Sequence, residues 1–238
     1  MSIDLATAVE DFWAARGRGE FFPLAYADRL ELDEAYRIQL ALIDRRVAAG
    51  ERQIGWKVGL TAKPIQQQFG FHEPVFACVL ETQPTGHTFG ATELINPGFE
   101  TELCMRLGRG LEGTVSLEQV RDAVDVVYPS FEIIETRGDL VKQIALALAD
   151  NGQQRSVVIG APVKLTPALQ LDQVEVRVQL NGDEVATGLG SAVLGHPLNS
   201  IRWLAEKLGQ YGRALRAGDI AVAEFSGIGR VEARIASA

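Results

Sequence analysis

The chain has 238 residues, of which 47% are hydrophobic and 23% charged, and it carries a formal net charge of −8. A chain of this length can bury a sizeable core without disulfides, and its acidic balance argues against nucleic acid as a main partner. No apolar run is long enough to predict a membrane span, and the N-terminus lacks the basic region and apolar core of a signal peptide. Two cysteines are too few for a disulfide framework, so we expect reduced thiols and a cytoplasmic protein.

Helical spacing of apolar residues dominates the N-terminal part of the chain. It predicts helices over residues 2–17 and 32–49. Outside their apolar stripes both segments are polar, which is typical of helices that cover a larger body. We therefore predict one domain over residues 1–238, in which residues 1–50 are a helical lead-in and residues 51–238 form a β-rich core.

The next informative segment, Ile54–Thr61, is predicted to be a strand that carries two glycines and one lysine. Glycines such as Gly55 and Gly59 weaken a strand and often mark the close approach of a ligand or another backbone. Lys57 lies on the opposite face from the apolar residues, where a lysine is most often simply solvated. A short helix at 63–69, an apolar strand at 75–80 and a loop at 81–90 follow.

Strict alternation predicts a strand over Phe99–Leu107, with Glu100, Glu102, Cys104 and Arg106 on one face. Two carboxylates so close together repel each other unless positive charge lies between them. On an exposed strand, water and Arg106 supply this compensation; in a cleft, a divalent metal does so. The spacing alone is compatible with both interpretations.

A second carboxylate candidate lies in the long apolar strand predicted over residues 125–135. Glu132 is flanked there by phenylalanine and isoleucine, and a carboxylate in such surroundings is costly unless it is paired or metal-bound. Pro129 within the same strand indicates a sheet edge or a bulge.

The remaining segments mix helix and strand without regular alternation. The Asn181-Gly182 pair predicts a type I′ hairpin between strands at 174–180 and 183–187. The pattern favours an α+β fold with a largely antiparallel or mixed sheet. We predict further helices at 116–120, 141–148 and 197–208, and strands at 155–159, 220–225 and 230–235.

The histidines and cysteines limit the kind of metal that this chain can hold. His72, His87, His196, Cys78 and Cys104 show no spacing typical of zinc ligands. Any metal is therefore expected to be oxygen-bound, as Mg²⁺, Mn²⁺ or Ca²⁺ are.

Several motifs together resemble the 2-hydroxypentadienoate hydratase and 4-oxalocrotonate decarboxylase group of the fumarylacetoacetate hydrolase superfamily. They occur in the family's order and cover nearly the whole chain. The motifs are Gly55-Trp56-Lys57-Val58-Gly59-Leu60-Thr61, Gln66-Gln67-Gln68-Phe69-Gly70, Glu73-Pro74-Val75-Phe76, Glu100-Thr101-Glu102, Pro129-Ser130-Phe131-Glu132, Ala149-Asp150-Asn151, Gly195-His196-Pro197-Leu198-Asn199 and Ala217-Gly218-Asp219.

The resemblance implies a β-rich roll preceded by helices, and a Mg²⁺ or Mn²⁺ site formed by Glu100, Glu102 and Glu132. It also implies that Lys57 is the catalytic residue. Three carboxylates leave positions open on a hard cation, where a 2-oxo acid can chelate. Beside that metal, a partly desolvated Lys57 is expected to have a lowered pKa and to move a proton. The implied substrate contacts are Gly59, Leu60, Val75, Asp150, Asn151 and Gly190.

The activity implied is that of a metal-dependent lyase of aromatic-compound catabolism, a hydratase that adds water to a 2-hydroxy-2,4-dienoate. A 4-oxalocrotonate-type decarboxylase is the alternative, because hydratases of the group typically carry Asp where this chain has Val75. A third possibility is an acylpyruvate hydrolase with His72 and Glu73 as its water-activating pair. The implied partners are a small 2-oxo or 2-hydroxy-dienoic acid and further copies of the chain, or a paralogous decarboxylase or hydratase.

One departure from the family concerns the C-terminal part of the chain. After Ala223-Glu224-Phe225-Ser226 the sequence continues almost directly into Gly227-Ile228-Gly229, where the family has a further loop and strand. The missing segment usually helps to form the wall of the substrate pocket. Together with Val75, this departure leaves open a catalytically degenerate partner subunit.

Overall fold

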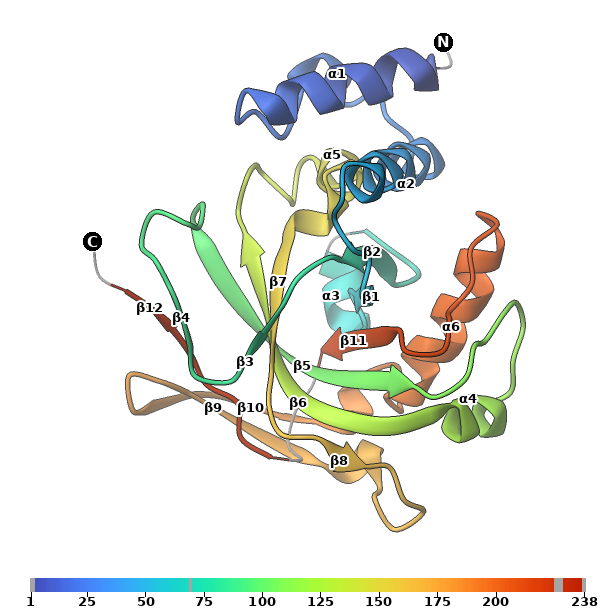
Figure 1. Cartoon of the computed structure of the whole chain (residues 1–238), viewed down its shortest axis with the longest axis vertical. Helices are drawn as coiled ribbons and strands as arrows, with labels where there is room; N and C mark the ends of the chain where they lie inside the picture. The colour runs from blue at the N-terminus through green and yellow to red at the C-terminus, as the bar shows by residue number, and fades with distance from the viewer. Residues whose placement is uncertain (1–2, 69, 225–228, 237–238) are drawn as a thin grey trace.

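A curled mixed sheet with helices around it forms the core of the molecule (Figure 1). The structure is a computed structural model that describes residues 3–68, 70–224 and 229–236. The strands of this sheet are β1 (Gly55–Gly59), β2 (Val75–Val79), β3 (Thr82–Pro84), β5 (Pro97–Leu107), β6 (Val124–Glu135), β7 (Gln154–Ile159), β8 (Val163–Lys164) and β11 (Ile220–Glu224).

The order of the strands explains the curl. The sheet runs β2-β1-β11-β5-β6-β7-β3, and β8 also pairs with β6. Strands β2 and β3 lie at opposite ends of this order, yet only Leu80 and Glu81 separate them in the chain. The two ends of the sheet must therefore approach each other, and Glu81 accepts a hydrogen bond from Val157 of β7 at 3.1 Å. This closure confirms the expected roll, whose sheet is mixed because β1 and β11 are parallel.

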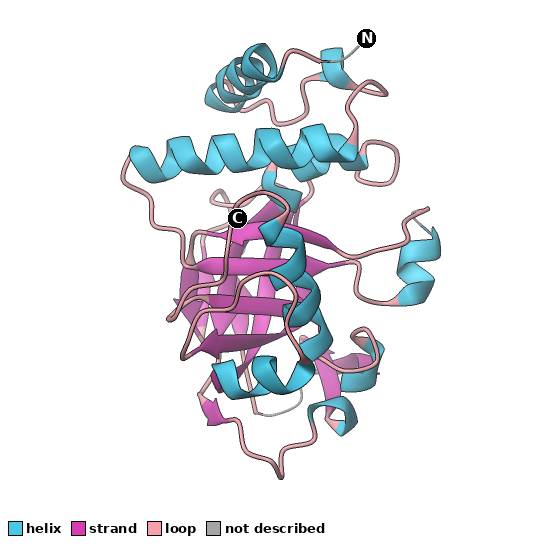
Figure 2. Ribbon diagram, turned by 90° about the vertical axis from the view of Figure 1, so that its right-hand side faces the viewer, coloured by secondary structure: helices cyan, strands magenta, loops and turns pink. Residues whose placement is uncertain are grey.

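Two helices, α1 (Leu5–Gly17) and α2 (Leu32–Ala48), lie outside one end of the sheet (Figure 2). Both begin at the signals that the sequence contains. Asp4 accepts a hydrogen bond from the Ala6 N–H, and Glu31 and Glu34 form a reciprocal capping box. Helix α2 is anchored by the buried Gln39, whose Nε2 donates to the Leu148 carbonyl at 2.7 Å.

The remaining elements surround the sheet. Asn181 and Gly182 have φ values of 54° and 96°, as the predicted type I′ turn requires. None of the described helices is long and apolar enough to cross a membrane. These elements are α3 (Lys63–Gln68), α4 (Leu117–Ala123), α5 (Ile144–Ala149), α6 (Leu198–Gly209), the hairpin β9 (Glu175–Leu180) and β10 (Asp183–Leu189), the pair β4 (His87–Phe89) and β12 (Ala233–Ile235), and 3₁₀ turns at 24–26, 151–153, 171–173 and 190–192.

Two expectations about local structure were wrong. The predicted loop at 81–90 contains β3 and β4, because β7 and β12 from later in the chain supply their hydrogen-bonding partners. The helix expected from Val141 begins only at Ile144. Before it, Asp139 accepts a hydrogen bond from the Lys142 N–H at 3.1 Å, and this side-chain turn competes with helix.

Pro129 lies in the middle of a central strand rather than at a sheet edge, and it is paired with Leu103 of β5. On its other side, β6 pairs with β7 at residues 130–134 and with β8 at residues 126–127. Pro129 falls between these two partners, and its carbonyl accepts a hydrogen bond from the Gly160 N–H at 2.8 Å. The predicted C-terminal departure at residues 225–228 lies outside the described residues.

Candidate metal centre and cavity

Four charged side chains from three strands share one face of the sheet. Glu100 and Glu102 are two residues apart on β5 and therefore point to the same side. Glu132 of β6 stands directly opposite Glu100 in the register. Lys57 of β1 reaches the same group across the curl, with its Nζ 2.8 Å from Oε2 of Glu132 and 3.7 Å from Oε2 of Glu100.

The three glutamates are close enough to hold one metal ion. One carboxylate oxygen from each lies within 4.8 Å of the others, and this is the one such cluster of histidine, cysteine and acidic side chains in the described part of the chain. Glu102 and Glu132 are 1% and 0% exposed, whereas the Glu100 side chain is 34% exposed. Two of the three carboxylates are thus buried inside the protein, and the third is partly exposed to solvent.

The charges and donor atoms of the site fit a divalent cation. Three carboxylates against one lysine leave two negative charges in excess, and a buried excess of this kind is costly without compensation. Carboxylate oxygens are the ligands that hard divalent cations prefer. Arg106 cannot compensate them, because its guanidinium bonds both oxygens of Asp125 at 3.2 and 2.9 Å. This finding excludes the interpretation in which Arg106 neutralises the two β5 glutamates.

The pKa of Lys57 does not follow the expected direction. Burial of the side chain lowers the pKa, but the charges of Glu132 and Glu100 outweigh burial and hold it above its usual value. Among the protein's own groups, Lys57 is therefore a fixed ammonium. The expected lowering requires further positive charge beside the carboxylates.

A cavity of about 130 Å³ opens beside Lys57 and Glu100. Gly59, Leu60 and Val75, three of the substrate contacts implied by the resemblance, line it. Of the described residues that line the cavity, Lys57 is the one cation. The rest of the wall is formed mainly by apolar side chains and contains Ile65, Phe76, Ala77, Ile134, Leu140, Ile144, Ala147, Leu148, Gly152 and Gln153.

The other three implied substrate contacts are not among the residues that line this cavity. The carboxylate of Asp150 accepts from Arg137 Nε at 2.5 Å. The Asn151 amide bonds both the N–H and the carbonyl of Cys78 at 2.8 Å. Gly190 packs so closely that a Cβ there would lie 1.8 Å from the Leu171 carbonyl oxygen. In each case the structure shows a packing or hydrogen-bonding contact within the protein.

Two residues near the site were not singled out as site residues by the sequence. Gln153 is 3% exposed and lines the cavity beside Gly152. Arg137 is equally buried and bonds Glu135 at 2.7 Å. Its second partner, Asp150, comes from a separate segment that the spacing of residues does not indicate.

Other conspicuous side chains have structural surroundings. Cys104 is fully buried in a small apolar cluster. His196 accepts a hydrogen bond from the Leu198 N–H at 3.1 Å, at the start of α6. His72 is exposed, and its neighbour Glu73 pairs with Lys207 at 2.7 Å, away from the cavity. The His72–Glu73 pair therefore does not support the hydrolase interpretation.

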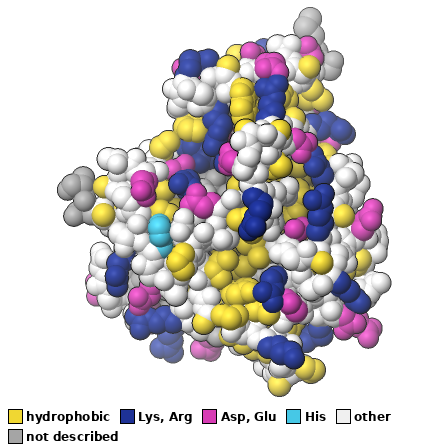
Figure 3. Space-filling model, in the orientation of Figure 1, with side chains coloured by type: hydrophobic (Ala, Val, Ile, Leu, Met, Phe, Trp, Pro, Cys, Tyr) yellow, Lys and Arg dark blue, Asp and Glu magenta, His cyan; other side chains and the backbone are white. Residues whose placement is uncertain are grey.

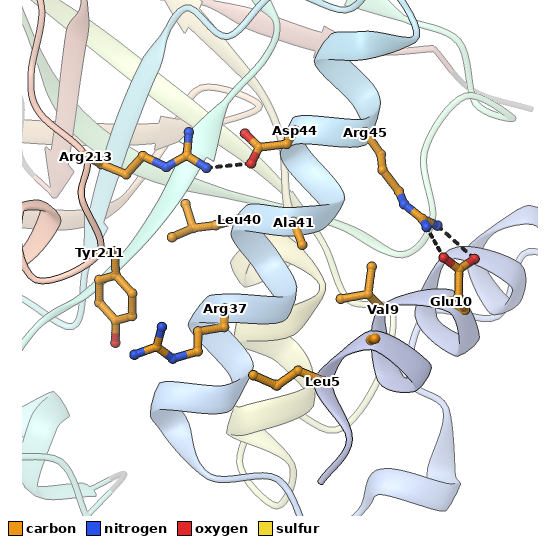
Figure 4. A pocket seen from close by; sticks show the side chains of 11 residues that line it. Leu5, Val9, Glu10, Arg37, Leu40, Ala41, Asp44, Arg45, Tyr211 and Arg213 are labelled. Atoms are coloured by element: carbon orange, nitrogen blue, oxygen red, sulfur yellow. Dashed lines mark hydrogen bonds and ion pairs between the residues drawn. The ribbon is translucent and has the colours of Figure 1, made fainter.

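A wider depression of about 570 Å³ lies between α1, α2 and Tyr211 (Figure 4). Its floor is apolar, and its three arginines are neutralised in pairs, Arg45 with Glu10, Arg213 with Asp44 and Arg37 with Asp33. Such paired surface charges provide no cluster of ligands. On the face seen in Figure 3, basic and acidic side chains are also interspersed rather than gathered into a stripe of one sign.

Comparisons with known proteins show which family this chain resembles. The family described as fumarylacetoacetate (FAA) hydrolase C-terminal matches residues 83–223. A 2-hydroxyhexa-2,4-dienoate hydratase of Comamonas testosteroni is 34% identical over 80% of this chain and 75% of its own length. A 2-keto-4-pentenoate hydratase of Paraburkholderia xenovorans (strain LB400) is 35% identical over 80% and 72%.

The fold also resembles a solved structure over nearly its whole length. The 4-oxalocrotonate decarboxylase from Pseudomonas putida G7, complexed with magnesium and adipate, aligns with a TM-score of 0.85 and 26% identity. The alignment covers 98% of this chain and 97% of that one.

Proposed function

The chain belongs to the fumarylacetoacetate hydrolase family, and from this membership and the site described above we propose that it is a metal-dependent lyase that hydrates a 2-hydroxy-2,4-dienoate. The observation that carries the proposal is the cluster of Glu100, Glu102, Glu132 and Lys57 at the end of a small, largely apolar cavity. We also propose that the reaction belongs to the catabolism of aromatic compounds, as the family resemblance implies.

The three glutamates would hold Mg²⁺ or Mn²⁺, both of which are hard cations that accept carboxylate ligands. When bound, such a cation supplies a Lewis acid that attracts the carboxylate and 2-oxygen of the substrate and stabilises negative charge on that oxygen. Glu100, the most exposed of the three, faces the cavity from which the substrate approaches.

Lys57 is the residue that can hold and move a proton at this site. Hydration of a 2-hydroxydienoate removes the hydroxyl proton, adds a proton to the carbon chain, and then adds H and OH across the remaining double bond. The Lys57 ammonium lines the cavity and is held by the Glu132 carboxylate at 2.8 Å. It can therefore donate a proton to the carbon chain and regain one from the hydroxyl group of the substrate, so that this step needs no other proton source.

The wall of the cavity favours a substrate with one carboxylate. A diacid such as 4-oxalocrotonate has a second carboxylate that would lie away from the metal, where burial without a cation is costly. Away from Lys57, the described wall is instead formed by side chains such as Ile65, Leu140 and Ile144. This composition suits the uncharged end of a pentadienoate or hexadienoate. The sequence identity of 34–35% to the two hydratases, against 26% to the decarboxylase of known structure, agrees with it.

A decarboxylase is the second candidate. Val75 lines the cavity at the position where hydratases of the group typically carry Asp, and the solved structure most like this one in the comparison above is a decarboxylase. A catalytically degenerate partner subunit is the third. The complete set of three glutamates and a lysine argues against it, because such a buried group is costly to retain without a function.

The remaining attributes that we propose are cytoplasmic location, assembly into homo-oligomers or with a paralogue, and a single domain in which residues 1–50 cover the core of residues 51–238. Free, buried Cys78 and Cys104 support a reducing compartment. The bond from Gln39 of α2 to Leu148 of α5 supports one folded unit.

An ultraviolet assay with 2-hydroxypenta-2,4-dienoate and with 4-oxalocrotonate, with and without Mg²⁺, tests the proposal. We expect metal-dependent loss of the dienoate and no release of CO₂ from the diacid. Glu102→Gln should abolish turnover, whereas Glu112→Gln, which changes an exposed carboxylate outside the cluster, should not. Release of CO₂ would instead identify a decarboxylase, and turnover of neither compound by the metal-loaded protein would favour the partner subunit.

A further inference from the structure

We propose that Arg137 is a positioning residue that keeps Lys57 and Glu132 in their relative positions. It does so by joining the end of β6, the strand that carries Glu132, to the turn that lies beside Lys57. The inference rests on the proposed function for its kinetic test, but its structural test is independent of turnover. Arg137 itself is not among the residues that line the cavity.

Each of the three guanidinium nitrogens of Arg137 donates a hydrogen bond, and the acceptors belong to two separate segments of the chain. Nη1 donates to Oε2 of Glu135 at 2.7 Å, Nε donates to Oδ2 of Asp150 at 2.5 Å, and Nη2 donates to the Asp150 carbonyl at 3.0 Å. The side chain is 3% exposed, and the ring of Phe21 lies 5.1 Å from its guanidinium carbon. A planar, permanently charged fork with several donors is the group that can make all three bonds at once.

The first segment carries a metal ligand. Glu135 is the last residue of β6, three residues beyond Glu132. Its other oxygen accepts from the Ile95 N–H at 3.1 Å, and Arg155 lies 4.0 Å away. The Glu135 side chain therefore adds bonds to the end of the strand that carries Glu132, where the backbone ladder pairs Glu135 with Pro97 of β5.

The second segment is an unusual backbone turn. Asn151, Gly152 and Gln153 have φ values of 58°, 59° and 61°, which places three consecutive residues in the left-handed region. Non-glycine residues rarely adopt this conformation, and it persists only where the surroundings hold it. Here the bond from Arg137 to the Asp150 carbonyl holds the start of the turn, and the Asn151 amide fastens the turn to Cys78 of β2.

This turn lies beside Lys57. A Cβ added to Gly152 would lie 3.3 Å from Cβ of Ala77 and 3.9 Å from Cε of Lys57, the latter an ordinary van der Waals distance, and Gly152 and Lys57 line the same cavity. Gln153, the next residue, lines the cavity. Arg137 thus links the strand that carries Glu132 to the surface that limits where the Lys57 ammonium can lie.

The test compares Arg137→Lys with the unaltered protein and with Arg213→Lys. Both variants keep the positive charge, but Arg137→Lys cannot make three bonds, whereas Arg213 pairs with Asp44 outside the site. We expect kcat of Arg137→Lys to fall by about tenfold to a hundredfold with KM little changed, because small displacements of reacting groups are costly. Arg213→Lys should keep its kcat.

Two further readouts separate positioning from loss of fold. Electron paramagnetic resonance of bound Mn²⁺ should show a changed zero-field splitting in Arg137→Lys at nearly unchanged Mn²⁺ affinity, and this arm remains informative if no dienoate is turned over. Guanidinium added to Arg137→Ala should restore kcat in a saturable manner. A wild-type kcat and spectrum in Arg137→Lys would overturn the proposal. The proposal would also be overturned if added guanidinium did not restore kcat and if the loss of kcat only followed the fraction of unfolded protein.

Discussion

Lys57 and Glu132 lie on strands that are separated by β11 and β5 in the sheet, yet their charged atoms are 2.8 Å apart. The curl of the sheet brings them together, and both are nearly excluded from solvent, at 6% and 0% exposure. A buried pair of this kind gives little net stability, but removal of one partner leaves the other charge uncompensated.

We expect Lys57→Met to lower the free energy of unfolding of the metal-free protein by about 3–5 kcal/mol, because it leaves the buried Glu132 carboxylate and its two neighbouring glutamates without their cation. Urea unfolding followed by circular dichroism measures this change. Glu112→Gln, at an exposed site, serves as the control. A loss of unfolding free energy no larger than that of the control would contradict the interaction assigned to Lys57 and Glu132.

Lys57→Met removes the positive charge and keeps a side chain of similar length. Turnover should fall by about a hundredfold or more, since a positioned proton donor is lost. Without Lys57 the three glutamates repel one another more strongly, so Mn²⁺ should raise the melting temperature more in this variant than in the wild type. Differential scanning calorimetry with and without Mn²⁺ measures the effect, with Lys63→Met in the exposed part of α3 as the control. Equal shifts in the three proteins would show that Lys57 does not share the metal site.

Ile65→Arg should shift the substrate preference toward diacids. Ile65 lines the cavity and is 36% exposed, so an arginine there can keep its charge hydrated and still reach a second carboxylate. We expect the ratio of kcat/KM for a diacid to that for a monoacid to rise by about tenfold, the value of one charge-assisted bond. Ile65→Met controls for the change of shape. An unchanged ratio would mean that the distal end of the substrate lies elsewhere.

Stability should depend on pH through His196. Burial lowers the pKa of its imidazole below the ordinary value, and the ring accepts the Leu198 N–H at the start of α6 only when it is neutral. Below the ordinary histidine pKa, the unfolded chain therefore binds a proton more readily than the folded chain does. The free energy of unfolding is expected to fall as the pH drops from about 7 toward 5.

His196→Asn keeps an acceptor but does not titrate, so its unfolding free energy should fall less over the same pH range. Parallel urea titrations of the two proteins at several pH values isolate this contribution from that of other groups. If the unfolding free energies of both proteins changed equally with pH, His196 would not be the source of the pH dependence.

Gln39→Leu should destabilise the protein through the attachment of α2. Nε2 of Gln39 donates to the carbonyl of Leu148 at 2.7 Å and to that of Phe76 at 3.3 Å, and both bonds are buried. Their loss leaves two carbonyls without this donor, and we expect a cost of about 1–3 kcal/mol. Chemical denaturation measures it against Gln67→Leu, at an exposed position of α3. A stability equal to that of this control would show that α2 is held by apolar packing alone.

The sequence predicts the parts of the site that depend on strand periodicity. Alternation alone puts Glu100 and Glu102 on one face of β5, and the apolar neighbours of Glu132 already mark it as a buried carboxylate in need of a partner. That these glutamates and Lys57 meet was expected only from the family resemblance. Their meeting depends on register and on the curl, which no local pattern encodes.

What the sequence does not predict is long-range pairing between short or irregular segments. Strands β3 and β4 have three residues each, and their partners β7 and β12 lie far along the chain. The second partner of Arg137, Asp150, is likewise brought to it by a loop and the turn at 151–153. Asp150 and Asn151 were expected at the substrate from the resemblance, but their polar groups bond Arg137 and Cys78.

The parallel pairing of β1 with β11 has a consequence for biosynthesis. Gly55 is translated well before Ile220, where the strand beside it begins. Contacts between such distant parts of a chain form slowly, and until they form the strand that carries Lys57 has one edge exposed. During synthesis the nascent chain therefore carries an open strand edge, and assembly of the charged cluster must await the synthesis of β11.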